Sequence, residues 1–81
     1  MNDVIQVTAI WDEEARVWVA ESEDVPGLIT EAGTLEQLVS KLESMVPELL
    51  ELNGISLGQQ ETVPLRILSE RVISLAHGHP A

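Results

Sequence analysis

The side chains of this sequence that could do chemistry are carboxylates, and they gather in two short runs. The first run is Asp12, Glu13 and Glu14, and the second is Glu21, Glu23 and Asp24. A hard divalent cation needs several oxygen ligands that converge on one point. The two runs fall in turns at opposite ends of one predicted hairpin, so we do not expect them to converge. We therefore interpret both runs as solvated surface.

Histidine, serine and glycine offer no better catalytic set. His77 and His79 form a pair near the chain end, which is a weak metal site without a third ligand. Ser22 stands among acids, which do not activate a hydroxyl as a nucleophile. Gly54 and Gly58 lack the following lysine of a phosphate-binding loop. The sequence thus predicts a protein that is not an enzyme and that carries no metal or cofactor.

The charge balance indicates the kind of partner that the protein could hold. Four Lys and Arg stand against fourteen Asp and Glu, for a formal net charge of −10. This balance argues against nucleic acid and anionic membranes, whose binding needs cations, and it suits a basic protein. The alternative is that the acids only keep the protein soluble. With no basic leader, no long apolar run and no cysteine, we expect a cytoplasmic protein.

The spacing of apolar residues predicts the elements that position these side chains. Alternation predicts strands, and recurrence at i, i+3 and i+4 predicts a helix. The predicted strands are residues 4–11, 16–22, 28–32 and 65–75, and the helix follows Thr34 and stops at Asn53-Gly54. The order β-β-β-α-β predicts an α+β fold, with a four-stranded mixed sheet and one helix packed on one face. We expect a single domain over residues 1–76 and a flexible tail over residues 77–81.

Local signals support these boundaries. Thr34 followed by Gln37 is typical of a helix N-terminus, where the threonine side chain accepts a hydrogen bond from the backbone. Pro26-Gly27 predicts a type II turn. Pro47 lies inside the helical pattern on its solvent side, so we expect a kink there.

The pairing of the first two strands determines which side chains share a face. A four-residue loop places Trp11 opposite Arg16, Ala9 opposite Trp18 and Val7 opposite Ala20. A five-residue loop would move every partner side chain to the other face. We prefer the first because it sets a small alanine beside a large tryptophan. One face then carries Ile5, Val7, Ala9, Trp18 and Ala20.

Trp11 and Trp18 are the only aromatic residues. One is expected under the helix, and the other, Trp11, is expected to be exposed as an anchor for a partner. The alternative places both in the core. The predicted partner-binding residues are Trp11, Glu13, Glu14, Glu21, Glu23 and Asp24.

The last predicted strand is longer than its neighbours can pair. An overhanging strand leaves backbone groups available to a second copy of the chain. We therefore expect a homodimer through the fourth strand, with Val72, Ile73 and Leu75 buried between subunits.

Three runs of the chain resemble the HicB-like antitoxin superfamily. They are WDEEARVWVAES at residues 11–22, DVPGLIT at residues 24–30 and GTLE at residues 33–36. The chain is most similar to a small branch with no assigned function, in which the helix ends near PELLELN, residues 47–53. The resemblance spans roughly residues 4–70.

This resemblance implies a partial ribonuclease-H-like fold without nuclease activity. It also implies binding to a small, basic, RNA-cleaving toxin of the HicA kind. Many HicB antitoxins carry a C-terminal DNA-binding segment, for which this sequence has no counterpart after the fourth strand. A second interpretation stays open: a stand-alone homo-oligomeric domain that binds a small ligand or an unrelated protein. A basic, toxin-like reading frame beside the gene would favour the first.

Overall fold

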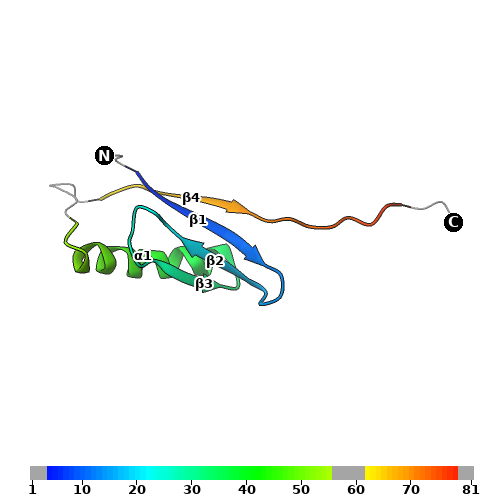
Figure 1. Ribbon diagram of the computed structural model, residues 1–81, viewed down its shortest axis with the longest axis horizontal. Coiled ribbons are helices and arrows are strands. Elements are labelled where there is room, and N and C mark those ends of the chain that lie inside the picture. Colours follow the sequence, from blue (N-terminus) through cyan, green and yellow to red (C-terminus); the bar gives the residue numbers. More distant parts are fainter. Residues whose placement is uncertain (1–3, 56–61, 79–81) are drawn as a thin grey trace.

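The structure, a computed structural model, describes residues 4–55 and 62–78. Its elements are β1 (Ile5–Asp12), β2 (Val17–Glu21), β3 (Ile29–Ala32), α1 (Leu35–Leu52) and β4 (Leu65–Glu70). The strands form one mixed sheet in the order β3-β2-β1-β4, and α1 covers one of its faces (Figure 1). The predicted α+β fold is therefore confirmed.

The hairpin of β1 and β2 has the predicted face but not the predicted register. Trp11 lies opposite Trp18, and Ala9 lies opposite Ala20. The predicted register is thus wrong by two residues, a shift that leaves every side chain on its predicted face. The reason is Asp12, which stays in β1 and accepts hydrogen bonds at Oδ1 from the backbone nitrogens of Glu14 and Ala15, at 3.0 and 3.1 Å.

The loop of this hairpin closes at Arg16. Its backbone nitrogen donates to the carbonyl oxygen of Asp12 at 2.8 Å, and its φ is 59°. The left-handed conformation is uncommon for a residue with a side chain, and it turns the chain back into β2. The loop therefore comprises residues 13–16, four residues as predicted, but it starts one residue later.

The turn before β3 and the start of α1 follow the sequence prediction. Gly27 has φ of 86°, and the backbone nitrogen of Leu28 donates to the carbonyl oxygen of Val25 at 3.1 Å, as in a type II turn. The Thr34 hydroxyl accepts from the backbone nitrogen of Gln37 at 3.1 Å and caps the helix. These two local motifs orient β3 and α1 against the sheet.

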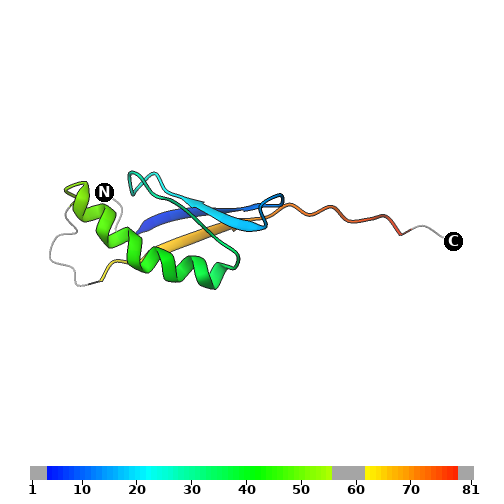
Figure 2. The same cartoon turned by 90° about the horizontal axis from the view of Figure 1, so that it is seen from below.

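Helix α1 is continuous through Pro47, which is exposed, and its axis bends along its length (Figure 2). It ends at Leu52 with Asn53 as its C-terminal cap, as predicted, and Gly54 follows with φ of 67°. No helix in the described ranges has the length and apolarity needed to cross a membrane.

The core lies between α1 and the sheet, and it is wholly aliphatic. Its buried side chains are Ile5, Val7, Ala9, Ala20, Val25, Leu28, Ala32, Leu38, Leu42, Val46 and Leu50. The helix contacts β2 and β3. Beside it, on the same face, runs a groove of about 650 Å³ whose lining includes Ile5, Val46, Val63, Leu65 and Ile67. The helix therefore leaves the apolar flank of β4 partly open.

Strand β4 ends earlier than predicted. It pairs in parallel with β1 from Ile5 opposite Leu65 to Ile10 opposite Glu70. The prediction that the strand reaches Leu75 is wrong, because β1 turns into the hairpin loop after Asp12 and offers no further partner. Residues 71–78 continue beyond the sheet as an exposed, extended segment, which we call the arm (Figure 1).

Candidate protein-binding surface

The sheet has a second face, turned away from α1, which no described element covers (Figure 2). We call it the open face. The strand registers and the alternation of side chains place twelve residues on it. They are Gln6, Thr8, Ile10 and Asp12 of β1, Val17, Val19 and Glu21 of β2, Ile29 and Glu31 of β3, and Arg66, Leu68 and Glu70 of β4.

The centre of the open face is apolar. Ile10 lies opposite Val19, and both line a shallow hollow of about 480 Å³. Ile10 keeps 46% of its surface exposed, although isoleucine is among the residue types most often buried. An exposed branched side chain in the middle of a sheet is well placed to contact another protein.

Carboxylates surround this apolar centre. Glu31 lies beside Val19, and Glu70 lies beside Ile10, so that the row Glu31–Val19–Ile10–Glu70 crosses the whole sheet. Asp12 and Glu21 lie in the rows on either side. We call Asp12, Glu21, Glu31 and Glu70 the acidic rim. An apolar centre with a polar rim is the usual anatomy of a protein–protein interface.

Trp11 lies on the opposite side of β1 from Ile10, although it also lines the edge of the hollow. It shares the helix-facing side of the sheet with Ala9 and is half-buried. Its ring makes an edge-to-face contact with Trp18, with centroids 5.4 Å apart, and the Arg71 guanidinium stacks over it at 4.3 Å. Trp11 is therefore half-buried rather than exposed as expected, because the true register pairs it with Trp18 and the start of the arm lies over its ring; its role as a partner anchor stays a prediction.

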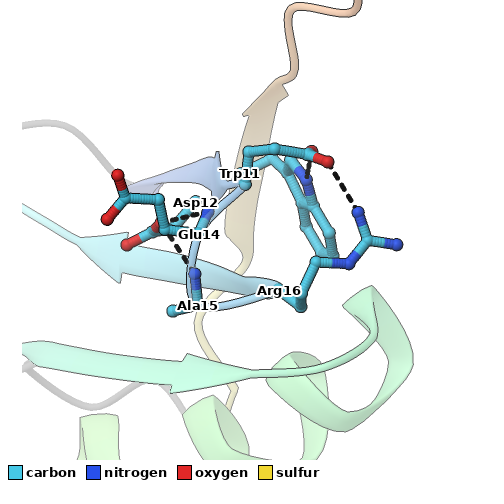
Figure 3. Close-up of polar contacts among 6 residues, drawn as sticks. Trp11, Asp12, Glu14, Ala15 and Arg16 are labelled. Atoms are coloured by element: carbon cyan, nitrogen blue, oxygen red, sulfur yellow. Dashed lines mark hydrogen bonds and ion pairs between the residues drawn. The ribbon is translucent and has the colours of Figure 1, made fainter.

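Glu13 contacts Trp11 and Arg16 at the hairpin loop; Figure 3 shows Trp11 beside Arg16, with Asp12, Glu14 and Ala15 of the same loop. The Glu13 carboxylate accepts from the Trp11 indole Nε1 at 2.6 Å and from Arg16 Nη1 at 2.7 Å. The ion pair with Arg16 joins two side chains that are 65% and 66% exposed. Glu13 and Glu14 are both exposed, and both line the hollow beside Ile10. Both residues stay predicted partner contacts, and Glu13 also stabilises Trp11 and Arg16 within the chain.

The contacts of Glu13 predict a change in its titration. The hydrogen bond from Trp11, together with the charge and hydrogen bond of Arg16, holds the pKa of Glu13 below its ordinary value. A lowered pKa stabilises the fold above the ordinary pKa of a glutamate, and this contribution is lost as the pH falls through the lowered pKa. We expect Trp11→Phe, which removes the donor, to raise the pKa of Glu13 towards its ordinary value.

This titration can be followed by NMR of the Glu13 side-chain carboxyl. Trp18→Phe is the matched control, because Trp18 changes by the same substitution but makes no recorded hydrogen bond to Glu13. An equal shift in both variants would show that the indole hydrogen bond does not set the pKa.

The second acidic run divides between two roles. Asp24 Oδ2 accepts from the backbone nitrogen of Gln6 at 2.9 Å, and the Ser22 hydroxyl donates to the Gln6 carbonyl at 2.6 Å. Ser22 and Asp24 thus tie the loop before β3 to the start of β1. Glu21 points onto the open face, and Glu23 is exposed beside it. The two acidic runs stay at opposite ends of β2, as predicted.

The metal and cofactor predictions concern the chain end and the acidic runs. Among the described residues, no group of three or more histidines or acids lies close enough to hold a metal ion. His77 is described and exposed, whereas His79 lies outside the described residues. The site residues absent from the predicted partner-binding set are Ile10, Val19, Asp12, Glu31 and Glu70. The alternation of residues 4–11 already put Ile10 outward, but only the strand order brings Glu31 and Glu70 beside it.

Comparison with known proteins gives a family and a related structure. A family described as "Domain of unknown function (DUF1902)" matches residues 4–75. The crystal structure of a hypothetical protein from the extremely thermophilic bacterium Thermus thermophilus is similar, with 51% sequence identity and a TM-score of 0.67. The similarity covers 91% of this chain and 99% of that chain. No curated protein matches the chain. The family match runs through Leu75, so it includes most of the arm.

Proposed function

The chain belongs to the family of unknown function DUF1902, and from this premise we propose that it is a non-catalytic module that holds a small basic protein on its open face. The observation that carries the proposal is Ile10, exposed beside Val19 and enclosed by the acidic rim. The alternative that the acids serve only solubility does not account for an isoleucine left exposed at their centre.

Charge and apolar contact have separate tasks in this proposal. The net charge of −10 draws a basic protein towards the molecule and raises the rate of association. Burial of Ile10 and Val19 then slows dissociation, because most differences in affinity between related complexes lie in the dissociation rate. Salt should therefore slow association and leave dissociation nearly unchanged.

The resemblance to HicB-like antitoxins suggests the class of partner. We infer that this family is a branch of that superfamily, and that the partner is an RNA-cleaving toxin of the HicA kind. A toxin that binds RNA must carry cations that contact phosphates, and the acidic rim offers carboxylates to the same cations. Covering this basic surface would neutralise the toxin in the cytoplasm without any catalysis by the antitoxin.

An NMR titration tests this proposal. Isotope-labelled protein is titrated with a purified HicA-family toxin whose catalytic residue has been replaced. We expect the amide signals of β1 and β2 around Ile10 and Val19 to shift, and those on the solvent side of α1 to stay unchanged. Shifts confined to α1 would exclude the open face, and no shift at high micromolar toxin would exclude this class of partner.

A further inference from the structure

Strand β4 is an edge of the sheet, and no strand among residues 4–55 and 62–78 pairs with its outer side. The backbone nitrogen of Ile5 donates to the carbonyl oxygen of Pro64 at 3.0 Å. Because successive residues of a strand direct their backbone groups to opposite sides, Leu65, Ile67 and Ser69 point theirs outward. The backbone nitrogen of Pro64, which carries no hydrogen, lies on the β1 side of the strand. Pro64 therefore removes no hydrogen-bond donor from the outer edge.

The arm adds apolar side chains to this open edge. Val72, Ile73 and Leu75 are 85%, 61% and 79% exposed. Arg71 fixes the start of the arm on Trp11, so that the arm leaves the sheet in line with β4 (Figure 1). A long unpaired edge with apolar residues is a template for another strand.

Charged residues are placed symmetrically about Leu68, and this arrangement favours β4 of a second copy as the pairing strand. Arg66 and Glu70 are two residues before and two residues after Leu68, and all three side chains lie on the open face. Within the described part of the chain, the side chains of Arg66 and Glu70 make no ion pair and no hydrogen bond. In an antiparallel pair centred on Leu68, each arginine would lie opposite the glutamate of the other copy.

We propose that β4 pairs antiparallel with β4 of a second copy about a two-fold axis at Leu68. Arg66 then faces Glu70 of the partner subunit, twice by symmetry. The arm runs along the partner edge, where Val72 meets Pro64 of the partner subunit and Ile73 meets Val63 of the partner subunit. Since Val63 lines the groove beside α1, Ile73 covers an apolar surface that the helix leaves open.

Other positions of the axis do not form these pairs. An axis at Ile67 or Ser69 sets Arg66 and Glu70 against uncharged residues. An axis at Glu70 sets two glutamates opposite each other, which is destabilising. An axis at Leu68 also leaves Ile10 uncovered, together with three residues of the acidic rim, Asp12, Glu21 and Glu31. This pairing therefore goes beyond the proposed function and does not depend on it.

Charge exchange tests the pairing, with the mass of the protein in solution as the readout. By sedimentation velocity we expect the wild-type protein to be a dimer. Arg66→Glu and Glu70→Arg each place like charges opposite each other at two symmetric positions, and each should raise the dimer dissociation constant at least tenfold. An equimolar mixture of the two variants restores both opposite-charge pairs, so it should form a heterodimer, and the double variant should again form a homodimer.

Glu31→Arg is the matched control, since it makes the same charge change as Glu70→Arg but lies on the other edge strand, β3. It should leave the dimer unchanged. Wild-type protein that stays monomeric at high micromolar concentration would overturn the proposal. So would a dimer that both single variants leave intact, or single variants that do not associate when mixed.

Discussion

Trp11→Ala is expected to lower the free energy of unfolding of the isolated protein by about 2–3 kcal/mol. Truncation of a tryptophan in a core costs about 3–5 kcal/mol, and Trp11 is half-buried, so a smaller loss is expected. The substitution removes the edge-to-face pair with Trp18 and the stacking of Arg71. Each such interaction contributes on the order of 1 kcal/mol. A chain of 81 residues has a total stability of roughly 4–12 kcal/mol, so this loss is large.

Chemical denaturation of the variant and the wild type measures this loss. Both proteins should be compared at one concentration, because self-association makes apparent stability depend on concentration. Trp11→Phe keeps an aromatic ring against Trp18 and should retain most of the stability. A loss below roughly 0.5 kcal/mol for Trp11→Ala, the size typical of a surface substitution, would show that the contacts of Trp11 do not stabilise the fold.

The fold could be predicted from the sequence because each element is specified by local chemistry. The Thr34 cap, the Pro26-Gly27 turn and the stop at Asn53 each depend on a few neighbouring residues. Period-two alternation and the helical stripe then assign the buried faces. These signals do not need knowledge of which strands are neighbours.

The hairpin register and the end of β4 depend on tertiary contacts. Asp12 looks like a loop residue in the sequence, yet its side chain accepts two backbone hydrogen bonds and keeps it in β1. Strand β4 alternates through Leu75, but its partner β1 ends at Asp12. The local sequence pattern of a strand does not show where its partner strand ends.

The candidate surface was only half predictable for the same reason. The acids were expected to act together at the hairpin, but Glu13 holds Trp11 and Asp24 holds the loop before β3. Glu31 and Glu70 join the rim only through the strand order. An excess of acidic residues in a sequence indicates electrostatic steering of a basic partner. The position of each acidic side chain, in contrast, depends on the strand order of the sheet.

The second large effect concerns Ile10. Ile10→Arg removes the apolar centre of the open face and places a cation among the carboxylates of the rim. We expect it to weaken binding of the basic partner by at least about 2 kcal/mol, the usual threshold for a binding hot spot, which corresponds to roughly 30-fold in the dissociation constant. Leu52→Arg is the matched control, because it changes the net charge equally at a site 82% exposed at the end of α1.

The measurement that tests the central claim most directly is the affinity of these two variants and of the wild type for the HicA-family toxin, by isothermal titration calorimetry. If the open face holds the partner, Ile10→Arg loses roughly 30-fold or more in affinity, whereas Leu52→Arg, with the same net charge, stays within about threefold of the wild type. If both variants bind as the wild type does, or both lose the same amount, the open face is not the binding surface and the account is wrong.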